Sequence, residues 1–142
     1  MEITSHSTEE TKKLAQQIAS ELKGGSVLAL YGELGAGKTT FTRFLVEALD
    51  FDNRVQSPTF VISRIYQKVG NNEINRVNHI DLYRIVTLEE VQDLGLHEYF
   101  DEEDAITVLE WPEIVEEFLP EKTLRIYFTV GENDSRKILI KK

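Results

Sequence analysis

The sequence predicts an α/β fold in which a mixed β-sheet is flanked by helices. Amphipathic helical patterns alternate with short apolar runs, and such runs are typical of strands buried between two layers of helices. A glycine-rich segment, Gly32–Lys38, joins one of these strands to the next helical pattern. The chain has 142 residues, about the length of one domain, so we expect a single domain over residues 1–142.

The first third of the chain is predicted to form a helix, a strand and a second helix. Ser7 and Glu10 fit a capping box that opens a helix, and apolar residues follow at helical spacing. The pair Gly24-Gly25 predicts its end, because glycine readily adopts the left-handed conformation of a helix cap. The apolar run Ser26–Tyr31 predicts a buried strand, and Thr39–Leu49 predicts a helix.

The middle of the chain is predicted to hold a β-hairpin and a short helix. Two β-prone runs, Phe60–Val69 and Glu73–Leu82, flank the turn residues Gly70–Asn72. A second capping box, Thr87–Glu90, opens a helix that should end near Gly95.

The last third of the chain is predicted to add three strands and one helix. Ala105–Leu109 is an apolar strand, and Pro112 suits the first turn of the helix that follows it. We expect three side chains of that helix to point inward: Ile114, Val115 and Phe118. Thr123–Val130 and Lys137–Ile140 are predicted as late strands around the turn Gly131–Asp134.

Composition excludes several classes of function. The chain has no cysteine, so a disulfide scaffold, a cysteine zinc site and a thiol nucleophile are ruled out. The net charge of −9 makes tight binding to nucleic acid by this protein alone unexpected. The longest apolar run, Val27–Tyr31, is far too short to span a bilayer, and the first residues carry no secretory pattern. We expect a cytoplasmic protein with no membrane partner.

Acidic residues are concentrated in one stretch of the chain. Residues 86–122 carry 13 acids and one lysine. Such a stretch is usually a solvated face, and the alternative is a docking surface for a basic partner.

The strongest motif is Gly32–Thr39, which matches the phosphate-loop pattern G-x-x-x-x-G-K-[ST]. Its backbone N–H groups can surround phosphate oxygens, and the following helix directs its positive end at the same place. Lys38 adds a cation at the β- and γ-phosphates, while the Thr39 hydroxyl can ligate Mg²⁺. The chain lacks the guanine-reading pattern [NT]-K-x-D, so we expect ATP or ADP with Mg²⁺ rather than GTP.

Two acids could complete a metal site, as phosphate-loop proteins require. Glu110 ends an apolar strand, and Asp81 follows another strand in the segment His79–Arg84. Each could instead be a solvated acid at a strand end. His79 is either a catalytic base or, more commonly, a structural hydrogen-bonding residue.

Two further residues have open interpretations. Thr59 lies about twenty residues beyond the phosphate loop, where loops often sense the γ-phosphate, so it is a candidate switch residue or a plain turn residue. Trp111 is the single tryptophan, and it is either a core aromatic or a ring that contacts the base.

Taken together in this order, four motifs resemble those of the TsaE family: Tyr31–Thr40, Ser57–Phe60, His79–Arg84 and Glu110–Pro112. TsaE proteins are small ATPases of bacterial tRNA threonylcarbamoyladenosine synthesis. The resemblance runs over nearly the whole chain, and it implies a mixed β-sheet like that of P-loop NTPases. It also implies that the protein acts with TsaD and TsaB to drive or reset the transfer cycle, and meets tRNA only through that complex.

The resemblance also implies roles for individual residues. The residues expected to hold the phosphates are Leu34, Gly35, Ala36, Gly37, Lys38, Thr39 and Thr40. Thr39 and Glu110 are expected to bind Mg²⁺, and Lys38, Asp81 and Glu110 are the expected catalytic residues, with Asp81 near the γ-phosphate or a metal-bound water. Trp111 and Glu113 should lie near the nucleotide, and Thr8 or Thr11 should border the adenine.

An activating arginine is not evident from the sequence. The candidates are Arg43, Arg54, Arg64 and Arg84. A missing arginine predicts slow intrinsic turnover that partner proteins accelerate. Two other functions stay open: a small-molecule kinase, and an adaptor that nucleotide binding gates without hydrolysis.

Overall fold

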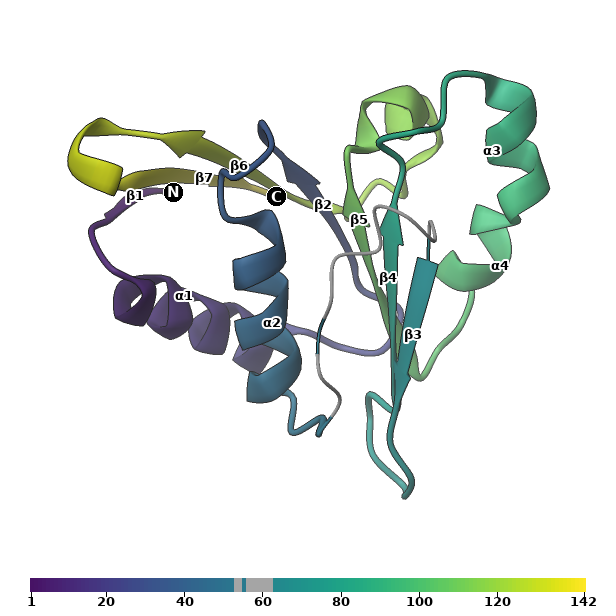
Figure 1. Cartoon of the computed structure of the whole chain (residues 1–142). Coiled ribbons are helices and arrows are strands. Elements are labelled where there is room, and N and C mark those ends of the chain that lie inside the picture. Colours follow the sequence, from purple (N-terminus) through teal and green to yellow (C-terminus); the bar gives the residue numbers. More distant parts are fainter. Residues whose placement is uncertain (53–54, 56–62) are drawn as a thin grey trace.

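The computed structural model describes residues 1–52, 55 and 63–142. Its strands are β1 (Glu2–Ser5), β2 (Val27–Tyr31), β3 (Ser63–Gln67), β4 (Arg76–Asp81), β5 (Ala105–Glu110), β6 (Leu124–Val130) and β7 (Arg136–Lys141). The α-helices are α1 (Thr8–Glu21), α2 (Lys38–Ala48), α3 (Leu88–Leu94) and α4 (Leu96–Phe100), and the 3₁₀ segments are η1 (Pro112–Phe118) and η2 (Glu132–Asp134). The predicted α/β fold is confirmed (Figure 1).

The sheet is mixed, as predicted, and its strand order is β1-β7-β6-β2-β5-β4-β3. The four central strands β6, β2, β5 and β4 run parallel to one another. The β7 strand pairs antiparallel with β6 and β1, and β3 pairs antiparallel with β4 as the predicted hairpin. The predicted beginning of that hairpin at Phe60 lies outside the described residues.

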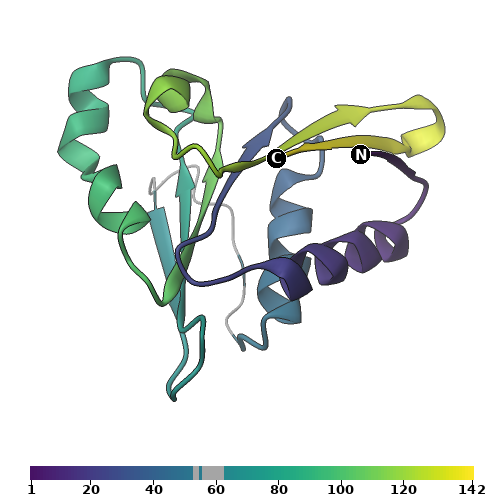
Figure 2. The same cartoon turned by 180° about the vertical axis from the view of Figure 1, so that it is seen from behind.

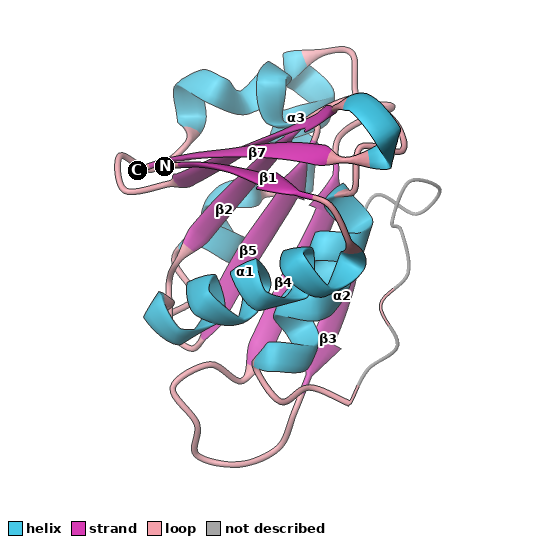
Figure 3. Cartoon of the chain, turned by 90° about the vertical axis from the view of Figure 1, so that its left-hand side faces the viewer, coloured by secondary structure: helices cyan, strands magenta, loops and turns pink. Residues whose placement is uncertain are grey.

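Helices cover the sheet on both faces (Figures 1 and 3). On one face, α1 and α2 pack against alternate strand residues such as Leu28, Ile106 and Ile126. On the other face, α3, α4 and η1 enclose a smaller cluster that contains Val27 and Leu109. Because both faces are covered, β2 is apolar along its whole length and β5 along most of it, instead of alternating with polar residues.

Both predicted capping boxes are present. The Ser7 hydroxyl accepts a hydrogen bond from the Glu10 N–H at 3.2 Å, and the Thr87 hydroxyl accepts one from the Glu90 N–H at 3.3 Å. The Glu10 carboxylate reaches back one residue beyond the cap and accepts from the His6 N–H at 2.7 Å. Helix α3 ends on Gly95 with a φ of 65°, the left-handed cap that the sequence predicts.

The end of α1 differs from the prediction. The helix stops at Glu21, and its cap residue Leu22 is extended instead of being a left-handed glycine. Gly24 serves a different purpose, because a Cβ placed there would lie 1.8 Å from the carbonyl oxygen of Glu103. Gly24 therefore allows the segment before β2 to pack closely against the segment before β5, and Gly25 forms a turn in which φ is 90°.

The segment after β5 also differs from the prediction. It is a 3₁₀ helix, in which Val115 is fully buried and Ile114 packs at the edge of the smaller cluster. Phe118, expected to point inward, is 44% exposed. A 3₁₀ helix rises about 2.0 Å per residue, so its last residue lies farther along the axis than the predicted α-helix would place it.

Two short elements were not predicted. β1 pairs with β7, and the terminal amino group of Met1 donates to the Ile140 carbonyl at 3.0 Å, so the chain begins beside its last strand (Figure 2). α4 directly follows Gly95. Within the described ranges, no helix combines the length and the apolar character needed to cross a membrane.

We expect Gly24→Ala to destabilise the fold, because the added methyl group meets a backbone carbonyl that cannot rotate away. Overpacking of this kind costs about 1–3 kcal/mol of unfolding free energy. Urea denaturation followed by circular dichroism measures the loss, with the exposed Ser20→Ala variant on α1 as control. An unfolding free energy equal to wild type in Gly24→Ala would contradict the packing described here.

Candidate phosphate-binding site

The phosphate loop connects the end of β2 to the start of α2. Gly32, Gly35 and Gly37 all have positive φ, at 148°, 79° and 106°, a region that residues with a Cβ rarely adopt. A Cβ on Gly32 would also lie 2.6 Å from the Phe128 carbonyl oxygen. The glycines of the motif are therefore required by the shape of the loop, which ends at the N-terminus of α2 as the motif demands.

Lys38 lies across the mouth of this loop. Its side chain is nearly buried, and its ammonium group donates to the Gly32 carbonyl at 2.5 Å. The same ammonium lies 3.6 Å from the centroid of the Trp111 ring, a cation–π contact. Burial lowers the pKa of Lys38, while the nearby carboxylates of Glu110 and Asp81 act in the opposite direction.

One cavity of about 200 Å³ lies against the loop and brings together most of the predicted residues. Its lining residues are Leu34, Gly35, Gly37, Lys38, Thr39, Thr40, Asp81, Glu110, Trp111 and Arg136. They come from the phosphate loop and the first turn of α2, from the carboxyl ends of β4 and β5 with the residue that follows β5, and from the start of β7. In an open α/β sheet this end of the parallel strands is where ligands bind.

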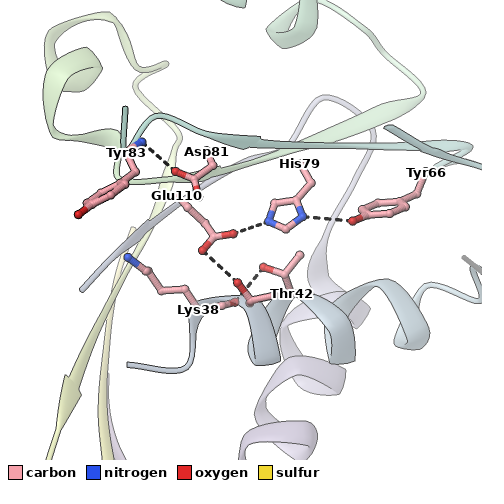
Figure 4. A network of polar contacts seen from close by, with 8 residues as sticks. Lys38, Thr42, Tyr66, His79, Asp81, Tyr83 and Glu110 are labelled. Carbon is pink, nitrogen blue, oxygen red and sulfur yellow. Dashed lines mark hydrogen bonds and ion pairs between the residues drawn. The ribbon is translucent and has the colours of Figure 1, made fainter. Parts of the chain in front are cut away.

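Glu110 is held by hydrogen bonds on both carboxylate oxygens. One oxygen accepts from the Thr39 hydroxyl at 3.3 Å. The other lies 2.5 Å from His79 Nε2 (Figure 4). The second ring nitrogen of His79 lies 3.4 Å from the Tyr66 hydroxyl. Because His79 is fully buried and does not line the cavity, its geometry favours the structural interpretation, in which it orients Glu110.

Asp81 lies beside Glu110 because β4 and β5 are parallel and in register, with Asp81 paired to Glu110. One Asp81 oxygen accepts a hydrogen bond from the Tyr83 N–H at 2.8 Å (Figure 4). Both carboxyl groups are nearly buried. Neither acid is therefore the solvated strand-end residue of the alternative interpretation.

Trp111 adopts a left-handed backbone conformation with a φ of 57°, which is uncommon for a bulky residue. Its ring packs against Tyr83, with centroids 4.9 Å apart, as well as against the Lys38 ammonium. The tryptophan is half-buried at the phosphate-loop cavity, so it is not a plain core aromatic.

A second cavity of about 310 Å³ adjoins the first. Thr8 and Thr11, the residues expected to border the adenine, both line it, together with the apolar side chains of Phe128 and Ile138. Gly37, Thr40 and Arg136 line both cavities, so they form the border between them. Glu113, which was also expected near the nucleotide, lines neither cavity. Partial burial raises the pKa of its carboxyl group, and the nearby Lys38 ammonium acts in the opposite direction.

Of the arginines suggested by the sequence, the three that the structure describes do not line either cavity. Arg43 is exposed on α2 over the Phe44 ring, and Arg64 and Arg84 are absent from both linings. Arg54 and Thr59 lie outside the described residues. Sequence reasoning missed Arg136, which donates to the Gly35 carbonyl at 3.3 Å across 101 positions of sequence. No local motif surrounds Arg136, so only the fold could reveal it.

The donor atoms at the cavity fit Mg²⁺. The Thr39 hydroxyl and the Glu110 carboxylate are hard oxygen ligands that already face each other at 3.3 Å. Among the residues that the structure describes, no group of three or more His, Asp and Glu side chains could hold a metal by itself. Two protein ligands such as Thr39 and Glu110 are enough for Mg²⁺, because water and substrate phosphates usually complete its coordination.

Comparison with known proteins identifies the family. The model of the family described as "Threonylcarbamoyl adenosine biosynthesis protein TsaE" matches residues 5–138. Two proteins named tRNA threonylcarbamoyladenosine biosynthesis protein TsaE are similar to the chain. The one from Bacillus subtilis is 42% identical over 92% of this chain and 78% of its own length, and the one from Aquifex aeolicus is 41% identical over 79% and 77%.

The fold points the same way. A crystal structure of YdiB from Bacillus subtilis superimposes with a TM-score of 0.78 and 35% sequence identity, over 97% of this chain and 82% of that one. A family match over most of the chain, relatives above 40% identity and a shared fold agree, and we conclude that this chain belongs to the TsaE family.

Proposed function

We propose that this protein binds ATP and ADP with Mg²⁺ at Gly32–Thr39 and hydrolyses ATP as a component of tRNA threonylcarbamoyladenosine biosynthesis. The observation that carries the proposal is the meeting of Lys38, Thr39, Asp81 and Glu110 around one cavity at the phosphate loop. The printed names of the relatives support the pathway. A role in tRNA modification further supports a cytoplasmic location for this protein.

The residues of the cavity have different roles in the proposed transfer of a phosphoryl group to water. Backbone N–H groups of the loop hold the phosphates, and Lys38 exchanges its Gly32 carbonyl partner for phosphate oxygens. Thr39 and Glu110 would hold Mg²⁺, which neutralises charge on the phosphates. Asp81 is held in place by a hydrogen bond from the Tyr83 N–H. It orients either the water that attacks the γ-phosphate or a water bound to the metal.

Trp111 couples the position of Lys38 to the nucleotide. In the structure the ring holds the ammonium by a cation–π contact of 3.6 Å. A triphosphate draws that ammonium toward its oxygens and weakens the contact. Trp111, like Glu113 on the following 3₁₀ segment, therefore lies near the nucleotide in this proposal without reading the base.

TsaD and TsaB are the proposed partners, and tRNA is reached only through them. A net charge of −9 does not favour direct contact with a phosphate backbone, which supports this indirect route. The acidic stretch, residues 86–122, contains α3, α4 and η1, and η1 directly follows Glu110 and Trp111 of the site. This stretch is a candidate contact surface. The Ser57–Phe60 segment, with the candidate switch Thr59, is the other proposed contact.

We expect Lys38→Ala to bind ATP more weakly. The substitution removes a charge-assisted contact worth roughly 1.5–3 kcal/mol, which corresponds to a loss of affinity of about tenfold or more. Isothermal titration calorimetry with MgATP measures it, and Lys13→Ala, exposed on α1, is the control for loss of one positive charge. Equal ATP affinity in Lys38→Ala and wild type would contradict the phosphate site.

We expect Glu110→Gln and Asp81→Asn to separate metal binding from hydrolysis. In Glu110→Gln, the difference in ATP affinity with and without Mg²⁺ should largely disappear, because a metal ligand loses its charge. In Asp81→Asn, MgATP should still bind while turnover falls by roughly 10²-fold or more, the usual scale for a residue that assists proton transfer. Glu117→Gln, exposed on η1, is the matched control. The reverse pattern, with Mg²⁺ dependence lost in Asp81→Asn alone, would exchange the two roles.

The partner assignment is tested by ATPase rates with and without TsaD and TsaB. We expect slow turnover by the protein alone and a rate increase when both partners are present. An unchanged rate at saturating partner concentrations would remove the partner assignment and leave the nucleotide site intact. A phosphorylated metabolite among the products would favour a small-molecule kinase. Full tRNA modification with a non-hydrolysable ATP analogue would favour a nucleotide-gated adaptor.

A further inference from the structure

Arg136 enters the site from the sheet edge opposite the two acids. It is the first residue of β7, just after the turn that follows β6. Its guanidinium donates from Nη1 to the carbonyl oxygens of Asp134 and Ser135, at 3.0 and 3.3 Å, and from Nη2 to that of Gly35 at 3.3 Å. The turn therefore fixes the group in place, half-buried, against the phosphate loop.

The position of Arg136 coincides with the border of the two cavities. It lines both of them, together with Gly37 and Thr40. A Cβ on Gly37 would lie 3.9 Å from Arg136 Nε, so the guanidinium borders the last glycine of the loop. If the loop holds the polyphosphate and the second cavity holds the nucleoside, this border is where the α- and β-phosphates lie.

The charge at the loop is unbalanced without Arg136. The charged side chains that line the phosphate-loop cavity are Lys38 and Arg136, which are cationic, and Asp81 and Glu110, which are acidic. Without the arginine, this lining would carry two acids against one cation. A guanidinium presents five N–H donors in a planar fork that matches two phosphate oxygens, and the three carbonyl contacts leave donors available for such oxygens.

We propose that Arg136 is a phosphate-binding residue that contacts the α- or β-phosphate of the nucleotide in this site. The inference rests on the proposed nucleotide binding and adds a residue of the β6–β7 turn to it. Because ADP and ATP share their α- and β-phosphates, Arg136 stabilises both complexes equally. It differs in this respect from an activating arginine, which acts on the γ-phosphate during hydrolysis.

The test is calorimetric titration of wild type, Arg136→Gln and Arg136→Lys with MgADP and MgATP. Glutamine keeps an amide donor for the carbonyls of the turn, and lysine keeps the charge without the fork. Arg43→Gln, exposed on α2, is the matched control for loss of an arginine charge. Thermal unfolding of each variant verifies that the fold is retained.

In Arg136→Gln we expect affinity for ADP and for ATP to fall by the same factor, roughly tenfold or more. Arg136→Lys should recover part of the loss, and Arg43→Gln should stay within about twofold of wild type. Unchanged ADP and ATP affinity in Arg136→Gln would overturn the inference while leaving the nucleotide site standing. A loss confined to ATP would overturn it too, by moving Arg136 to the γ-phosphate. If wild type bound neither nucleotide, the proposed function itself would fail.

Discussion

The parallel pairing of β2, β5 and β4 is the constraint on which the candidate site depends. In this register Leu30 pairs with Glu110, and Glu110 pairs with Asp81, so the three strands end at the same level. The phosphate loop leaves β2 just beyond that level and returns as α2. The pairing of these strands thereby brings Lys38, Thr39, Asp81 and Glu110 together at one end of the sheet.

Burial of charge is the energetic cost of this arrangement. Lys38, Asp81 and Glu110 are each 3–4% exposed, and His79 is fully buried. Burying a charge without a partner costs several kcal/mol, and here each group has partners in the structure. Glu110 lies between Thr39 and His79, Asp81 accepts from a backbone N–H, and Lys38 contacts a carbonyl and an aromatic ring. These contacts hold the groups in fixed positions, which suits the proposed phosphoryl transfer, since that reaction depends on the placement of charges.

The antiparallel edge of the sheet gives the site its second side. β6 and β7 extend the sheet past β2, and the turn between them carries Arg136 to the phosphate loop. The same strands supply Phe128 and Ile138, and α1 supplies Thr8 and Thr11, to the cavity that adjoins the loop. One side of the site is thus acidic and comes from β4 and β5. The other side carries Arg136 and the partly apolar cavity beside it, and it comes from β6, β7 and α1.

The sequence by itself determined the elements and motifs that depend on near neighbours along the chain. Capping at Ser7 and Thr87, the hairpin turn at Gly70–Asn72, the buried strand before the loop and the Gly32–Thr39 motif all follow from local backbone preferences and spacing. The acids could also be found, because the end of an apolar strand is a local feature.

Only the tertiary structure decided the features that rest on contacts between distant residues. Gly24 had the appearance of a helix cap but is required by the Glu103 carbonyl, and the 3₁₀ geometry of η1 leaves Phe118 exposed. The sequence left His79 open as a catalytic base or a structural residue, and its buried contact with Glu110 favours the structural role. Arg136 lies in no sequence motif, and its contact with Gly35 depends on the fold. Local preferences indicate where most elements begin, whereas a neighbour 101 positions away is set by strand pairing, which no single segment of the sequence encodes.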